Sequence, residues 1–84
     1  MSQKKDTMDM SEFFLRLLLA NGPGRFKLSA GKRTATIFRI TEENEEVPML
    51  GIFFTPDALK QCMQVWNSLS HPKLVHDNDI VRVN

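Results

Sequence analysis

Residues 25–40 read RFKLSAGKRTATIFRI, and this stretch decides the fold. Apolar and polar residues alternate on both sides of a glycine, which is the two-residue period of β-strands with one buried face. We therefore predict strands over 25–29 and 33–40, joined by a three-residue loop at 30–32. This loop length separates the apolar from the basic side chains, and a slip of one residue would reverse every side chain of the second strand.

The predicted register gathers the basic side chains on one face of the hairpin, opposite a face formed by Phe26, Leu28, Thr34, Thr36, Phe38 and Ile40. The cations of the basic face are Arg25, Lys27, Arg33 and Arg39, with Lys32 at the tip of the loop. The segment that follows, residues 42–46, is acidic and has no basic residue. Adjacent blocks of opposite charge predict a molecule with one positive surface.

The remaining segments predict a single α+β domain at 11–84, after a flexible tail at 1–10. The further elements expected are a helix at 11–21 with Ser11 as its N-cap, a strand at 49–54, a helix from 56 to about 70 and a strand at 80–83. The second helix has the clearest start, because Thr55 suits the N-cap and Pro56 the first helical position. Its apolar stripe includes Trp66, which we expect to anchor the helix on an antiparallel sheet of three or four strands.

The helix predicted at 11–21 is apolar on almost all sides, and a chain of 84 residues has little material to cover it. We therefore expect a homo-oligomer, a dimer or a tetramer. The residues expected at the subunit interface are Phe13, Phe14, Leu17 and Leu18. The apolar run is too short to span a membrane, and acidic residues separate it from the preceding lysines, unlike a signal peptide, so a cytoplasmic protein is expected.

No combination of residues indicates catalysis. Cys62 lies on the apolar side of the second helix, where a small buried side chain is expected. His71 and His76 lack the three or four organised ligands of a zinc site, and no serine or cysteine has a recognisable base. The glycines at 22 and 24 precede a strand rather than a helix, so they form no phosphate loop. We expect no enzymatic activity, no metal and no cofactor.

The basic hairpin is the feature that bears on function. Cations along a sheet surface suit the phosphates of a flexible single strand, whereas nothing in the chain looks like a helix made to enter a major groove. We therefore expect a non-catalytic protein that binds nucleic acid, preferring single-stranded DNA, as a transcription or replication cofactor. The expected contacts are Arg25, Lys27, Lys32, Arg33 and Arg39. The alternative explanation of these cations is a solvated face that keeps edge strands soluble.

The layout of residues 25–70 resembles the coactivator-type single-stranded-DNA-binding domains. It has a basic hairpin, an acidic turn, a strand that ends in Thr55-Pro56-Asp57 and a helix that carries Trp66. The resemblance implies a curved antiparallel sheet followed by a helix, and a dimer. The helix predicted at 11–21 and the segment after Pro72 depart from that family. The chain is also similar in character to small bacteriophage proteins, some of which bind single-stranded DNA and recruit a polymerase, while others inhibit host proteins.

The competing hypothesis is a protein-interaction module, an inhibitor or adaptor, that binds a partner through the apolar helix and the acidic turn. The two hypotheses predict different responses to salt. Nucleic-acid binding weakens steeply as the salt concentration rises, whereas an apolar interface does not.

Overall fold

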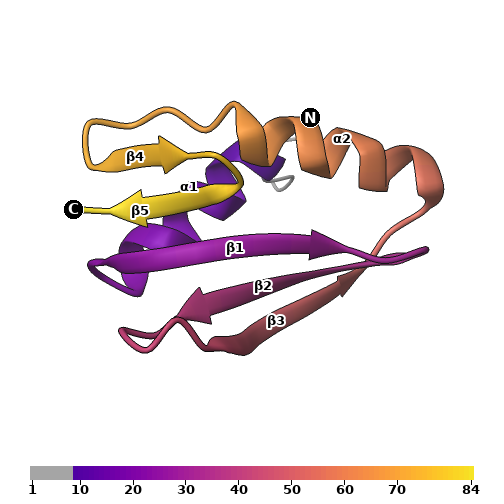
Figure 1. Cartoon of the computed structure of the whole chain (residues 1–84). Helices are drawn as coiled ribbons and strands as arrows, with labels where there is room; N and C mark the ends of the chain where they lie inside the picture. The colour runs from indigo at the N-terminus through magenta and orange to yellow at the C-terminus, as the bar shows by residue number, and fades with distance from the viewer. Residues whose placement is uncertain (1–8) are drawn as a thin grey trace.

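The computed structural model describes residues 9–84, which form two helices and a five-stranded antiparallel sheet (Figure 1). The elements are α1 (Met10–Ala20), β1 (Gly24–Ala30), β2 (Thr34–Ile40), β3 (Glu46–Phe53), α2 (Pro56–Asn67), β4 (Leu74–Asp77) and β5 (Ile80–Val83). The strand order across the sheet is β3-β2-β1-β5-β4. The predicted α+β class is confirmed, and the sheet has more strands than the three or four expected.

The two helices differ in how well their starts follow the prediction. The predicted N-cap Ser11 is wrong, because α1 begins at Met10 and Asp9 is its N-cap residue, without a side-chain hydrogen bond. α2 begins as predicted, with Pro56 in its first turn and the Thr55 hydroxyl oxygen accepting a hydrogen bond from the Ala58 N–H at 3.2 Å. Most of the tail predicted at 1–10 lies outside the described residues.

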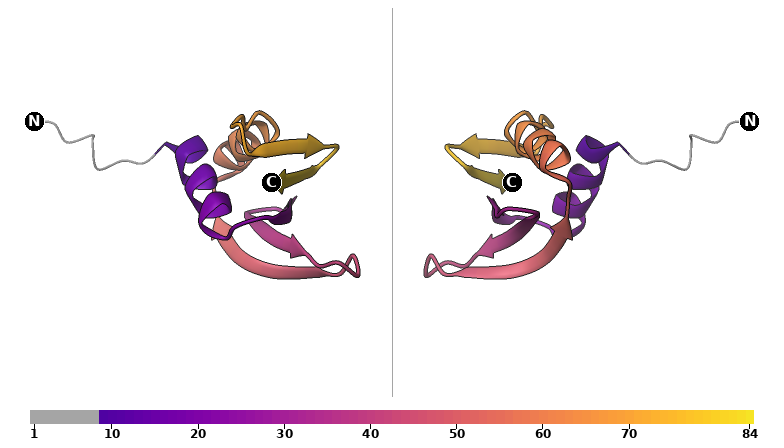
Figure 2. Two further views of the ribbon diagram at one scale, coloured as in Figure 1. Left: turned by 90° about the vertical axis from the view of Figure 1, so that its left-hand side faces the viewer. Right: turned by 90° about the vertical axis from the view of Figure 1, so that its right-hand side faces the viewer.

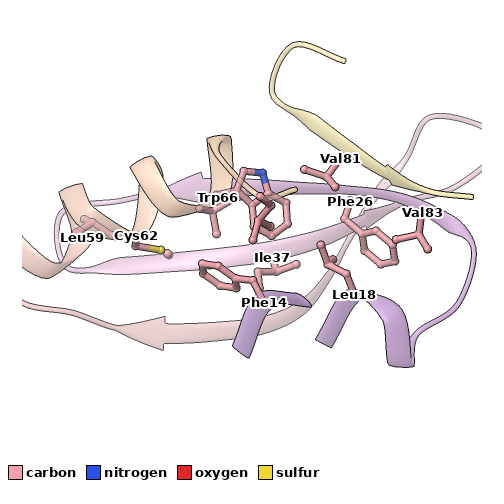
Figure 3. Packing of buried hydrophobic residues seen from close by; sticks show 12 residues of the cluster. Phe14, Leu18, Phe26, Ile37, Leu59, Cys62, Trp66, Val81 and Val83 are labelled. Carbon is pink, nitrogen blue, oxygen red and sulfur yellow. The ribbon is translucent and has the colours of Figure 1, made fainter. Parts of the chain in front are cut away.

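The sheet is strongly curved, and α1 and α2 pack on the same face of it (Figure 2). The centre of the core is the contact between Phe14 of α1 and Trp66 of α2, whose rings meet edge to face with centroids 5.4 Å apart (Figure 3). Trp66 is only 2% exposed and Cys62 is fully buried, so both sequence predictions for these residues are confirmed. The strands contribute Phe26, Leu28, Ala35, Ile37, Val81 and Val83 to the same cluster.

The register of the β1–β2 hairpin differs from the prediction, and the difference reverses β2. Lys27 lies opposite Phe38, and the Gly31 N–H donates to the Thr34 carbonyl oxygen at 2.7 Å, which leaves residues 32–33 as a two-residue loop. The predicted three-residue loop is therefore wrong. The register differs from the predicted one by an odd number of residues. The side chains of β2 expected on the solvent side therefore face the core, and those expected in the core face the solvent side.

The observed register turns Arg39 toward the helix side, and the contacts of its guanidinium explain why this arrangement is stable. Its guanidinium lies 5.1 Å from the centroid of the Phe26 ring and donates to the Pro23 carbonyl oxygen at 2.8 Å and the Asn21 carbonyl oxygen at 3.5 Å. Arg39 therefore sits at the rim of the core with partners for its N–H groups. Ile37 is then free to fill the interior, where it is fully buried.

The C-terminal segment forms a second hairpin. The strand predicted at 80–83 is confirmed as β5, and the turn before it contains Asn78 with a φ of 60°. β4 was not predicted, and it pairs with β5 as the other edge of the sheet. β3 begins at Glu46, earlier than expected, and a register shift interrupts its pairing with β2 between Ile37 and Phe38.

Candidate nucleic-acid interface

The face of the sheet turned away from α1 and α2, here called the outer face, is defined by the strand pairing. Its members, in rows across the strands, are Glu46, Ile40, Arg25, Arg82 and Val75, then Pro48, Phe38, Lys27, Ile80 and Asp77, then Gly51, Thr36 and Ser29, and last Phe53 and Thr34. No helix or strand of residues 9–84 covers this face, because none of these residues is buried. The outer face is therefore an open, curved surface.

Three cations lie on the outer face. Arg25 donates from Nη2 to the Thr41 carbonyl oxygen at 2.6 Å, which fixes its guanidinium at the end of β1. The Lys27 ammonium pairs with the Glu46 carboxylate at 2.9 Å. Arg82 of β5 lies directly opposite Arg25. Sequence reasoning missed Arg82, although its alternation with the buried Val81 and Val83 was the signal that placed it on the solvent side.

Two phenylalanines share this face with the cations. Phe38 lies opposite Lys27 near the middle of the sheet, because the observed register turns it outward. Phe53 lies opposite Thr34 and is 85% exposed, next to the hairpin loop. Phe38 is half-buried, so Phe53 is the more exposed of the two rings. Single-strand binders combine aromatic rings with cations, since bases stack on the rings while the cations contact the backbone.

The structure divides the five predicted contact residues among three places. Arg25 and Lys27 lie on the outer face. Lys32 and Arg33 form the exposed hairpin loop at one end of it. Arg39 is turned to the helix side at the other end of β2, so its expected place on the basic face is wrong.

Half of the predicted subunit interface is buried inside one chain. Phe14 and Leu18 are fully buried in the core and are therefore not available to a second subunit. Phe13 and Leu17 are half-buried and pack against that core. Two of the four residues predicted at a subunit interface are therefore covered within the chain, and the homo-oligomer stays a prediction.

An apolar groove of about 590 Å³ lies beside the edge strand β3. Its walls come from α1, α2, β3 and the residues next to them, namely Asp9, Met10, Phe13, Phe14, Leu50, Ile52, Phe54 and Gln61. Val47 of the same strand is 46% exposed. An edge strand with an apolar groove beside it is a surface to which an extended peptide can add.

Comparison of the chain with known protein families, with curated proteins and with solved structures finds no match in any of the three. Within residues 9–84 no three His, Cys, Asp or Glu side chains are grouped so that they could hold a metal ion. Neither α1 nor α2 has the length and apolar character that crossing a membrane requires.

Proposed function

We propose that this protein binds single-stranded nucleic acid, preferably DNA, on the outer face of its sheet, as a non-catalytic cofactor of transcription or replication. The observation that carries the proposal is the pairing of Lys27 with Phe38 at the centre of an uncovered face. Arg25 and Arg82 extend this face at one end and Phe53 at the other. Cations neutralise phosphates, and exposed rings stack on bases.

The shape of the outer face supports a single strand over a duplex. The seven residues of β2 span about 20 Å at ~3.3 Å per residue, a length that several nucleotides can follow. The hydroxyl groups of Ser29, Thr34 and Thr36 lie along this path, and such groups commonly bind phosphate oxygens. A flexible strand can adapt to the curvature of the sheet, whereas neither helix projects as a major-groove reader does.

Two carboxylates limit the positive charge of the outer face. Glu46 is paired with Lys27, and Asp77 lies on the edge strand β4. The remaining charge comes from Arg25 and Arg82, together with the loop at residues 32–33. Contact with three or four phosphates therefore gives a slope of roughly −2 to −3 in a plot of log K against log salt, at about −0.7 per contact on a single strand.

Fluorescence anisotropy with matched single-stranded and double-stranded oligonucleotides tests the proposal. The expected result is tighter binding of the single strand and an affinity that falls with added salt along that slope. Binding of neither oligonucleotide at low salt would refute the proposal. Tighter binding of the duplex would refute the assignment of the outer face to a single strand.

A second candidate function, a protein-interaction module, is favoured by the apolar groove beside β3. Its occupant would be an extended segment of another protein, because within residues 9–84 β3 pairs with β2 alone, and its Val47 side chain is exposed on the helix side of the sheet, where the groove lies. Such binding depends little on salt, since apolar contacts rather than ion pairs dominate it. Substitution of Ile52 by Lys would remove it and leave oligonucleotide binding at the outer face unchanged.

A further inference from the structure

Three arginines line one pocket of about 520 Å³ at the end of the outer face. Arg25 comes from β1, Arg39 from β2 and Arg82 from β5, and the pocket lies between the segment at 23–24 and the turn at 41–42. Within residues 9–84 none of the three has a carboxylate at ion-pair distance. Arg25 and Arg82 also lie directly opposite each other across neighbouring strands, an arrangement of like charges that is unfavourable without an anion.

Two of these guanidinium groups are held in place before any ligand arrives. Arg25 donates to the Thr41 carbonyl oxygen, and Arg39 donates to the Pro23 carbonyl oxygen while it lies over a phenylalanine ring. Each guanidinium has five N–H donors, so donors remain for a ligand. Gly24 makes this arrangement possible, because its φ is +155° and a Cβ there would come within 2.8 Å of Arg39 Nη2.

We propose that this pocket binds a phosphate monoester, the group found at the end of a nucleic-acid strand and on a mononucleotide. A monoester carries about −1.5 to −2 charges at pH 7, more than the single charge of an internal phosphodiester. Three arginine forks suit such a dianion, because each forms paired, charge-assisted hydrogen bonds to phosphate oxygens. The strand-end source rests on the proposed function, whereas binding of a free phosphate does not.

Glu42 also lines the pocket, and its negative charge opposes the binding of an anion there. Substitutions can therefore test the pocket by raising or by lowering its affinity for phosphate. We expect Glu42→Gln to tighten phosphate binding, because it removes a negative charge and keeps the size of the side chain. We expect Arg82→Gln to weaken it, because Arg82 is exposed and its hydrogen bond is to Asn84 at 3.3 Å, so its loss leaves the fold intact.

Titration with inorganic phosphate, followed by the ¹H–¹⁵N NMR signals of the arginine side chains, measures the pocket alone. Arg82→Gln should weaken phosphate binding roughly tenfold, which is the loss of one hydrogen-bonded charge. Lys60→Gln is the matched control, since it removes the same charge from the exposed side of α2 and should leave this affinity unchanged. Absence of phosphate binding by the parent protein, or equal weakening by both variants, would overturn the proposal.

Oligonucleotides of one sequence with a 5′-phosphate, a 3′-phosphate or hydroxyl ends identify the source of the monoester. Tighter binding of one phosphorylated form, lost in Arg82→Gln, places a strand end in the pocket. Equal binding of all three forms, with inorganic phosphate still bound, assigns the pocket to a free phosphate or mononucleotide. If no oligonucleotide binds but inorganic phosphate does, the proposed function is refuted and the assignment of the pocket to a phosphate group is retained.

Discussion

Lys27 and Phe38 lie directly opposite each other on β1 and β2, with both side chains on the outer face. The ammonium of Lys27 is held by Glu46 of β3, so the cation, the ring and the carboxylate span three neighbouring strands. This places an aromatic surface beside a fixed charge near the middle of the sheet. The relationship exists only in the observed hairpin register, because the predicted register turns Phe38 into the core.

Replacement of Phe38 by Ala should weaken single-stranded DNA binding by about 1–3 kcal/mol, the contribution of one stacked base. The salt slope should stay unchanged, because no phosphate contact is lost. Val47→Ala is the control, since it removes an exposed apolar side chain from the neighbouring edge strand but on the opposite face. Anisotropy titrations at several salt concentrations measure both quantities, and equal affinity of Phe38→Ala and the parent would exclude stacking on this ring.

Replacement of Trp66 by Ala should lower the free energy of unfolding by about 3–5 kcal/mol, as for other large core residues. Trp66→Phe should lower it much less, because it keeps a ring against Phe14 and removes an indole N–H that is buried without a hydrogen-bond partner within residues 9–84. Urea denaturation measures the two differences. Similar losses in the two variants would show that the edge-to-face contact with Phe14 depends on the indole.

Arg39 and Arg33 should respond differently to replacement by Ala, although both were predicted on one basic face. Arg39→Ala should lower the free energy of unfolding by about 1–2 kcal/mol, because it removes hydrogen bonds to two carbonyl oxygens and a ring contact with Phe26. Arg33→Ala should lower it by less than about 0.5 kcal/mol, as for other exposed loop residues. Thermal denaturation followed by circular dichroism compares the two, and equal stabilities would contradict the structural role of Arg39.

Burial raises the pKa of the Cys62 thiol, so the thiolate is scarce at neutral pH in the folded protein. Because the thiolate is the reactive form, a disulfide reagent should label the native protein far more slowly than the urea-unfolded protein at the same pH. Equal labelling rates would contradict the burial. The thiol has its ordinary pKa in the unfolded state, so the unfolded state loses the proton first as the pH rises. The raised pKa therefore contributes to the free energy of unfolding below the ordinary thiol pKa, and this contribution is lost in alkaline solution.

The sequence predicts best the elements whose signals are local. Thr55 and Pro56 define the start of α2, and the apolar stripe places Cys62 and Trp66 in the core, because capping and helical periodicity need no knowledge of the rest of the chain. The position of β5 after its turn is predicted for the same reason.

The hairpin register and the members of the site depend on contacts between distant segments. Alternation alone treats Arg39 as a solvent-facing residue, and nothing local shows that carbonyl oxygens of the α1–β1 connection satisfy it. The position of Arg39 on the helix side reverses the faces to which the side chains of β2 point. Phe38 therefore lies on the outer face. β4 is short and half polar, so only its pairing with β5 reveals it. The alignment of Arg82 with Arg25 likewise depends on the pairing of β5 with β1, two strands that lie far apart in the sequence.

The most direct test of the outer face as the nucleic-acid interface is to place a negative charge at its centre. Thr36 lies there between Ser29 and Gly51, and Gln64 lies exposed on α2, behind the sheet. Thr36→Glu and Gln64→Glu change the net charge equally, and circular dichroism confirms that both variants are folded. We predict that Thr36→Glu weakens binding of single-stranded DNA roughly tenfold or more at fixed salt, while Gln64→Glu binds like the parent. Binding by folded Thr36→Glu as tight as that of Gln64→Glu would contradict this prediction.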